Sequence, residues 1–310
     1  MIDVTKPLTK QPTRRKMNVW KRTTDLRIAL IFLAPSLILF SLFLFYPLFK
    51  TLFYSFHLTN AQGEASVFVG LENYRYLLTD PSFYQSIKST CLFTLYTVPA
   101  SICVSLFLAL LANEKLRGIG IFRVLFSSTM GISVAASAVI WLFLFHPSVG
   151  VFNNILGMLH LPAIEWLTSQ KWALISVSIP TIWMNIGFSF LVILGGLQNI
   201  DTTLYESAAI DGASYFYKLR KVTLPMLSPT LFFIATVTLI NAVQSFGQID
   251  ILTKGGPNDA TNLIVYSIYK EAFVNYQFGT ASAQAIVLFI FIFIATVLQF
   301  KFAERKVHYQ

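Results

Sequence analysis

The sequence predicts an all-α integral membrane protein with six transmembrane helices. Of the 310 residues, 55% are hydrophobic and only 12% are charged, a composition outside that of ordinary soluble domains. A bilayer core needs about 20 consecutive helical residues, and the apolar residues gather in runs of that length. The six runs are 28–49, 90–112, 124–145, 172–194, 229–251 and 283–302.

The positions of Lys and Arg predict how the six spans are oriented. Residues 1–27 form a basic tail, and the apolar run that follows is longer than a signal-peptide core, so we expect it to remain as the first span. Seventeen of the 23 basic residues lie in this tail, the second and fourth loops and the C-terminal end, against six in the other loops. The positive-inside rule then places both termini, including the tail 303–310, in the cytoplasm. Basic residues beside spans also account for the net charge of +9 without a nucleic-acid partner, and membrane lipid is the expected surrounding.

The outer loops, about 50–89, 146–171 and 252–282, contain local structural signals. Asp80 before Pro81 is typical of a helix N-cap followed by proline in the first turn, so a helix is expected to run from there into the second span. Gly255, Gly256 and Pro257 indicate a turn in the third outer loop. No Gly-Lys-Ser/Thr follows this turn, which argues against a phosphate-binding loop.

No catalytic or metal site is expected in this chain. No Asp, Glu, Lys, Arg or His lies in the core of the predicted spans, which argues against proton-coupled transport and intramembrane hydrolysis. The four histidines lie in loops or the tail without metal-ligand spacing. Cys91 and Cys103 are separated by roughly 18 Å along one predicted helix, at about 1.5 Å per residue, which is too far for a disulfide. We therefore expect a non-enzymatic chain that binds no cofactor itself.

The fourth loop, 198–228, looks like a helix between two spans. Thr203 and Glu206 fit a capping box, which predicts a helix beginning at Thr203. A nearly side-chain-free face bracketed by two aromatics would follow at helical spacing, formed by Tyr205, Ala208, Ala209, Gly212 and Phe216. Leu224-Pro225 is expected to end the helix before the fifth span. Such a face could pack against the chain's own spans or dock a cytoplasmic partner, and these residues alone leave both uses open.

The same loop resembles a known family motif. The spacing resembles the EAA loop of ABC-importer permeases, Glu-Ala-Ala-x3-Gly-x9-Ile-x-Leu-Pro. Here Glu206-Ser207-Ala208 is followed after three residues by Gly212, and after nine more by Val222-Thr223-Leu224-Pro225. Ser207 replaces the usual Ala, and Val222 replaces the usual Ile. Further strings over about residues 25–310 resemble the sugar-permease branch, which serves maltose-type or glycerol-phosphate-type systems: VGLENYRYLLTDPSFYQSIKST, LTKGGPNDAT and NYQFGTASAQA.

The resemblance implies a type I ABC importer permease (MetI-like) bundle, multi-pass in the cell membrane. In such importers the EAA helix sits in a groove on a cytoplasmic ATPase and converts ATP-driven closure into rocking of two permeases. The implied partners are a second similar permease, two copies of the ATPase, which bind ATP and Mg, and an extracellular or periplasmic solute-binding protein that delivers the sugar. If the roles of the family motif apply at the matching positions, the residues that couple the permease to the ATPase are Glu206, Ser207, Ala208, Gly212, Leu224 and Pro225, with Asp211 as a neighbour.

Polar and aromatic side chains inside the spans are candidates for the substrate pathway, because sugars bind through such groups without needing charge. The candidates are Asn241, Gln244, Ser245 and Gln248 on one helical stripe of the fifth span, Trp183 and Asn185 in the fourth, and Trp141 in the third. Alternatively, these groups hydrogen-bond between helices. The expected function is sugar import driven by ATP. The alternatives are a permease for glycerol-phosphate-type substrates, a membrane scaffold that recruits a partner without transport, and a proton-driven secondary transporter.

Overall fold

The computed structural model describes residues 19–60, 62–114 and 116–303. Most of the two predicted tails, residues 1–18 and 304–310, lies outside the described residues. The chain divides into two compact units, residues 1–50 and 51–310.

The described part of the first unit belongs to one long helix. Helix α1 (Val19–Phe40) continues through a π turn, η1 (Ser41–Phe45), into α2 (Tyr46–Tyr54). The N–H of Tyr46 bonds to the carbonyl of Ser41, five residues back, which widens the helix immediately before Pro47. Because proline has no N–H and crowds the preceding turn, a wide turn at this place lets the helix continue. The apolar stretch Ile28–Tyr54 therefore contains the predicted first span and extends beyond it.

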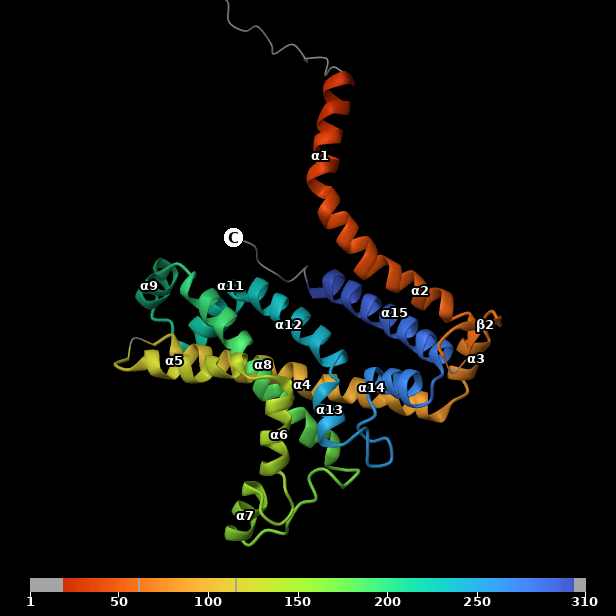
Figure 1. The fold of residues 1–310 in the computed structure, drawn as a ribbon. Coiled ribbons are helices and arrows are strands. Elements are labelled where there is room, and N and C mark those ends of the chain that lie inside the picture. Colours follow the sequence, from red (N-terminus) through yellow and green to blue (C-terminus); the bar gives the residue numbers. More distant parts are fainter. Residues whose placement is uncertain (1–18, 61, 115, 304–310) are drawn as a thin grey trace, which may run out of the picture. The chain divides into compact units, whose positions relative to one another are not determined.

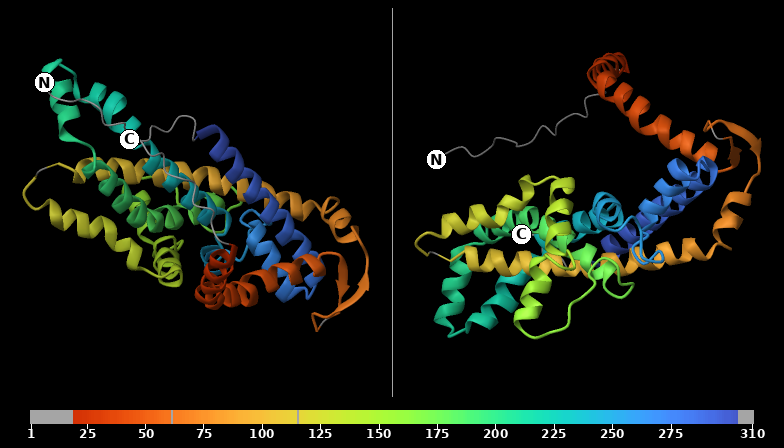
Figure 2. Two further views of the ribbon diagram at one scale, coloured as in Figure 1. Left: turned by 90° about the horizontal axis from the view of Figure 1, so that it is seen from above. Right: turned by 60° about the horizontal axis from the view of Figure 1, so that its bottom comes forward.

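Two long helices form the centre of the second unit. Helix α4 (Pro81–Ala112) packs along α8 (Ala173–Gln198) and runs the length of this unit in both figures (Figures 1 and 2). Small residues let two backbones approach closely inside a membrane. The buried face of α4 is rich in them: Ser86, Ser89, Thr90, Thr97, Ser101, Ser105, Ala109 and Ala112.

Two of the predicted spans are broken. The third consists of α5 (Ile119–Ser127), the 3₁₀ turn η2 (Ser128–Gly131) and α6 (Val134–Leu144), with a bend of 105°. The fifth is α12 (Ser228–Val243), followed after a short gap by α13 (Gly247–Leu252). The described residues hold four helices long and apolar enough to cross a membrane. The number rises to six if two bent pairs each count as one span: Ile119–Gly131 with Val134–Leu144, and Tyr215–Met226 with Ser228–Val243. The predicted helical membrane fold is confirmed, but the prediction of continuous third and fifth spans is wrong.

The remaining elements belong to loops and the sixth span. On the expected outer side lie a small antiparallel hairpin, β1 (His57–Thr59) with β2 (Ala65–Phe68), and the helices α3 (Glu72–Leu77) and α7 (Val151–Met158). Helix α14 (Ile264–Tyr269) and the π turn η4 (Lys270–Val274) precede α15 (Phe278–Ala303), the sixth span. The loop between α8 and α12 holds α9 (Thr202–Ile210), α10 (Tyr215–Lys218), the π turn η3 (Leu219–Thr223) and α11 (Leu224–Met226).

Several local predictions agree with these elements. The carboxylate of Asp80 accepts a hydrogen bond from the N–H of Ser82 at 3.0 Å, and α4 runs from Pro81 without interruption through the second span. The Gly256-Pro257 bond is cis within a loop that has several left-handed residues, as expected of a tight turn. Cys91 and Cys103 are both free.

The start of α14 is capped by a residue far away in the sequence. The N–H of Ile264 donates to the hydroxyl of Thr90 at 2.9 Å, and that hydroxyl donates to the carbonyl of Ser86 at 2.7 Å. The N-cap residue of α14 itself, Leu263, offers no side-chain acceptor. Thr90 therefore ties α14 to the second span in a buried place where no water replaces it.

We expect Thr90→Val to lower the stability of the protein by about 1–2 kcal/mol, because it leaves a buried N–H without an acceptor. Thr90→Ser keeps the hydroxyl and is the matched control, expected to stay close to wild type. The measurement is the midpoint of heat-induced aggregation of the detergent-solubilised protein. A Val variant as stable as the Ser variant would show that this cap contributes nothing.

Candidate functional site

The fourth loop begins with a helix capped by Asp201. Its carboxylate accepts a hydrogen bond from the N–H of Thr203 at 2.9 Å, and this bond lowers the pKa of Asp201. Because the lowered pKa favours the charged carboxylate, the cap is strongest above the ordinary pKa of Asp and is lost as the pH falls through the lowered value. The predicted capping box of Thr203 and Glu206 is wrong. Asp201 lies just before α9 and caps it at least as well as a threonine would, so Thr203 falls inside the first turn.

Gly212 ends α9 rather than lying within it. Its φ is +72°, in the left-handed region that glycine adopts at lowest cost. The N–H of Gly212 bonds to Ala209 at 3.0 Å and that of Ala213 bonds to Ala208 at 2.9 Å, which is the Schellman pattern of a helix C-terminus. A side chain added at Gly212 would meet nothing within 4 Å, so close approach of another backbone does not explain the glycine. The predicted continuous helical face through Phe216 is therefore wrong.

The loop has an inner side held by the chain and an outer side that is exposed. On the inner side, the hydroxyls of Tyr205 and Thr223 lie 3.0 Å apart in a hydrogen bond, and Tyr205 packs against the cluster that contains Leu197. On the outer side, Ile210 is 87% exposed and Phe216 is 78% exposed. The residues that pack against the spans are thus different from the exposed apolar residues. Ile210 is absent from the family motif, and its exposure is visible only in the structure.

Leu224-Pro225 lies inside a helix that continues to Met226. The N–H of Leu224 bonds to the carbonyl of Leu219, five residues back, so a π turn again comes directly before a proline, as it does before Pro47. The chain bends by 66° only after Met226, where α12 begins. The predicted helix stop at Leu224-Pro225 is therefore two residues too early, because the wide turn accommodates the proline.

Five of the seven predicted pathway residues line one cavity of about 380 Å³. The cavity lies among α8, the start of α6 and the gap between α12 and α13. Its polar lining includes Asn185, Asn241, Gln244, Ser245 and Gln248, as predicted, together with Thr181, and Val134, Met184, Phe246 and Gly247 complete it. None of these side chains carries a charge.

The fifth-span residues meet at a break and not on a continuous helical stripe. Helix α12 ends at Val243, and α13 begins at Gly247. Ser245 donates to the amide oxygen of Gln248 at 3.5 Å, and the amide nitrogen of Gln248 donates to the sulfur of Met184 at 3.1 Å. The prediction that these side chains lie on one face of a continuous helix is wrong, although the break brings the same side chains together. Gln248 is held in place by the protein, which leaves Asn241 and Gln244 without a protein partner for their side chains in the described part of the chain.

The structure places Trp183 and Trp141 outside this cavity. Their rings lie 6.0 Å apart in an edge-on arrangement, and Trp141 also stacks on Phe152 from α7. Asn153 fixes the adjoining outer loop, because its side chain bonds to Pro147, Ile164 and Trp166 at 3.0–3.1 Å. This aromatic cluster joins the spans rigidly to the outer loop.

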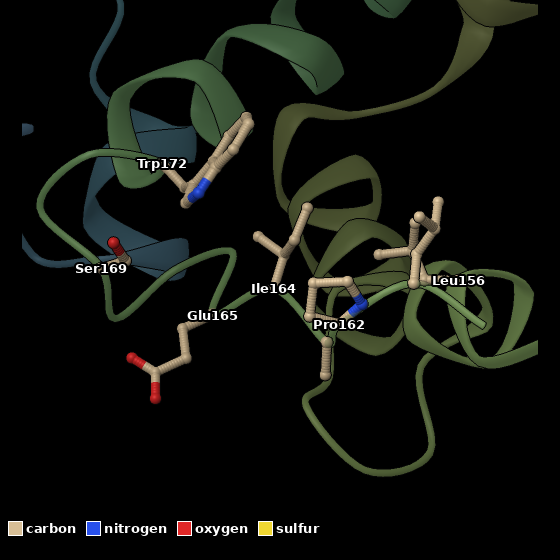
Figure 3. A pocket seen from close by; sticks show the side chains of 8 residues that line it. Leu156, Pro162, Ile164, Glu165, Ser169 and Trp172 are labelled. Carbon is tan, nitrogen blue, oxygen red and sulfur yellow. The ribbon is translucent and has the colours of Figure 1, made fainter. Parts of the chain in front are cut away.

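A second, larger hollow opens in that outer loop (Figure 3). Its volume is about 570 Å³, and its lining is mostly apolar with one carboxylate and one hydroxyl: Leu156, Leu161, Pro162, Ala163, Ile164, Glu165, Ser169 and Trp172. No predicted site residue lies in it. Among the described residues, no group of His, Cys, Asp and Glu could hold a metal ion.

Residues 82–308 match the family model of the binding-protein-dependent transport system inner membrane component. The chain belongs to this family. It is 35% identical over 282 residues to the sn-glycerol-3-phosphate transport system permease protein UgpA of Agrobacterium fabrum, covering 90% of this chain and 95% of the relative. The corresponding protein of Yersinia enterocolitica is 36% identical over 279 residues, covering 89% and 94%.

Solved structures of the same architecture agree with the fold. A bacterial ABC transporter that imports the acidic polysaccharide alginate matches with a TM-score of 0.78 and 23% identity, covering 93% of this chain and 99% of that chain. The MetNI methionine ABC transporter matches with a TM-score of 0.54 and 16% identity, covering 76% and 99%. At these identities the likeness concerns the fold alone.

Membership defines the role of the chain within a complex. It is a multi-pass inner-membrane permease subunit of an ABC importer, it is not an enzyme, and ATP is bound by a partner ATPase. The predicted family is confirmed. The named relatives are glycerol 3-phosphate permeases, so they agree with the alternative substrate better than with the predicted sugar.

Proposed function

We propose that this permease imports a small, uncharged, hydroxylated solute of the sugar class through the cavity between α8 and the break in the fifth span. The observation that carries the proposal is the lining of that cavity, which offers amides and hydroxyls but no charged group. Amides and hydroxyls both donate and accept, so they can replace the water bonds of a sugar's hydroxyls, and Phe246 offers an apolar face.

The second candidate is sn-glycerol 3-phosphate, which is favoured by the similarity of this chain to sn-glycerol-3-phosphate permeases. A phosphate bears about two negative charges near neutral pH and binds best to cationic or multiple N–H donors. The described lining supplies neutral donors only. An anionic solute would therefore need its positive partners from the second permease of the complex.

The fourth loop is the element through which we expect the ATPase to act. Ile210 and Phe216 are exposed apolar side chains of this loop, while Tyr205 and Thr223 hold its inner side to the spans. A large exposed apolar side chain on a soluble loop suits insertion into a groove on a partner. The family motif adds the other coupling residues: Glu206, Ser207, Ala208, Asp211, Gly212, Leu224 and Pro225.

The binding protein would approach from the other side of the membrane. The outer loop around α7 is rigid, and the hollow of Figure 3 gives it an apolar recess with Glu165 at its edge. A recess of this kind accommodates an anchoring side chain of a partner. The remaining subunits in this proposal are a second permease and two copies of the ATPase.

The whole assembly, reconstituted in vesicles with its ATPase and binding protein, tests the proposal. We expect ATP-dependent uptake of a neutral sugar and stimulation of ATP hydrolysis by the sugar-loaded binding protein. Uptake of sn-glycerol 3-phosphate with no uptake across a panel of neutral sugars would establish the second candidate. Uptake driven by a proton gradient without ATP would contradict both.

Replacing Asn241 and Gln244 by Ala should reduce transport roughly tenfold each and alter selectivity among solutes, because each change removes a hydrogen-bonding group, worth about 1.4 kcal/mol at that factor. Asn199→Ala is the matched control, since this exposed asparagine lies outside the cavity. Initial uptake rates for several solutes provide the measurement. Unchanged rates and selectivity in both cavity variants would remove this cavity from the pathway.

Gly212→Leu should leave the protein inserted in the membrane but uncouple ATP hydrolysis from uptake. A left-handed leucine costs about 1–2 kcal/mol, so the end of α9 rearranges and moves Ile210. Gly118→Leu is the control, because Gly118 has a φ of +82° and equally open surroundings in a different loop. We expect coupled uptake and ATPase retention to fail in the first variant only. Normal values for both in Gly212→Leu would contradict the docking role.

A further inference from the structure

A third cavity, of about 480 Å³, lies between the inner side of the fourth loop and the ends of two spans. Its volume far exceeds the roughly 30 Å³ that one water molecule occupies. The walls come from the end of α4, the end of α8 and the loop helices, and they comprise Leu110, Asn113, Glu114, Leu197, Tyr205, Tyr215, Lys218, Leu219 and Thr223. Neither the pathway nor the exposed pair of the loop uses this cavity.

The cavity lies at the depth where lipid headgroups are expected. Helix α4 ends at Ala112 and α8 at Gln198, and the apolar side chains of Leu110 and Leu197 face the cavity from those last turns. Arg123 donates two hydrogen bonds to the carbonyl of Ala112, at 2.8 and 3.0 Å, which fixes the end of α4. A lipid whose chains run beside these spans would bring its headgroup to this place.

The charges in the lining select the kind of headgroup. Among the described lining residues, the charged side chains are Glu114, which is exposed, and Lys218, and no ion pair joins either to a partner within that part of the chain. Lys218 is half-buried, where an unpaired charge is costly. A ligand that carries one anion and one cation would satisfy both.

We propose that this cavity binds the headgroup of a zwitterionic aminophospholipid of the phosphatidylethanolamine type. The phosphodiester pairs with the ammonium of Lys218, and the lipid's primary ammonium pairs with the carboxylate of Glu114. The hydroxyl of Tyr215 and the amide of Asn113 line the same space and can bond the remaining oxygens. An anionic lipid such as phosphatidylglycerol offers no cation for Glu114 and would be repelled by it.

A lipid held there would support the fourth loop on the side that faces the spans. It would fill the space between the loop and the spans, whereas Ile210 and Phe216 are exposed on the loop. Force applied by a partner on the exposed side would then reach the ends of α4 and α8 through a filled contact. Bound lipid should therefore raise the amount of transport obtained per ATP hydrolysed.

Native mass spectrometry of the assembled transporter, exchanged into detergent with equal phosphatidylethanolamine and phosphatidylglycerol, tests this. We expect one retained phosphatidylethanolamine per permease, and a roughly tenfold loss of retention in Glu114→Gln and in Lys218→Gln. Lys221→Gln removes the same charge from an exposed position outside the cavity and should retain the lipid. Transport per ATP in vesicles should fall in the first two variants only.

Four results would overturn the proposal. These are no retained lipid, preference for phosphatidylglycerol, equal loss in the Lys221→Gln control, and full retention in Glu114→Gln. A competition arm with soluble phosphoethanolamine distinguishes the source of the headgroup. Displacement of the lipid by phosphoethanolamine at equal concentration would assign the cavity to a free zwitterionic solute instead.

Discussion

Backbone hydrogen bonding inside the bilayer is the constraint on which the rest of this structure depends. No water is available there, so every N–H and C=O must find a partner in the protein. Where the helices are continuous this is automatic. Where they break, the chain supplies side chains: Ser133 accepts from Ala136 at the start of α6, and Thr90 accepts from Ile264 at the start of α14. The starts of α6 and α14 are thus capped, whereas α13 begins without a side-chain cap.

Two such breaks meet to form the polar cavity. The turn before α6 packs closely on α8 at Gly187, where an added side chain would come within 2.7 Å of the N–H of Met130. Val134, at the start of α6, faces Gly247, at the start of α13, so closely that a side chain on Gly247 would lie 2.6 Å from it. Because both helices begin here, neither fills the space, and the amides of the broken fifth span can line it.

The sequence predicted the features that depend on local chemistry or on apolar length. The cap at Asp80-Pro81, the helical membrane fold and most of the polar lining belong to this group. The break in the fifth span was not predictable, because Gln244-Ser245-Phe246 holds neither proline nor glycine and the polar residues around it keep helical spacing. Asp201 and Thr203 are both good caps, and only the backbone shows which one is used. A glycine at position 212 fits both a helix face and a helix end, and only the positive φ of Gly212 shows that it ends α9.

Helix α12 connects the two functional regions directly. It begins at Ser228, just after the fourth loop, and ends at Val243, where the polar cavity opens, a length of 16 residues or about 24 Å. Its start is held against α8, since a side chain on Gly196 would lie 2.8 Å from the hydroxyl of Thr230. A helix transmits displacement along its axis because its hydrogen bonds resist compression. The gap after Val243 lacks this hydrogen-bonded ladder, so it can change shape instead of passing the displacement on. Movement of the loop would therefore be expressed at the break, on Gln244 and Ser245, and the same break that creates a polar surface would make that surface responsive to an ATPase docked on the loop.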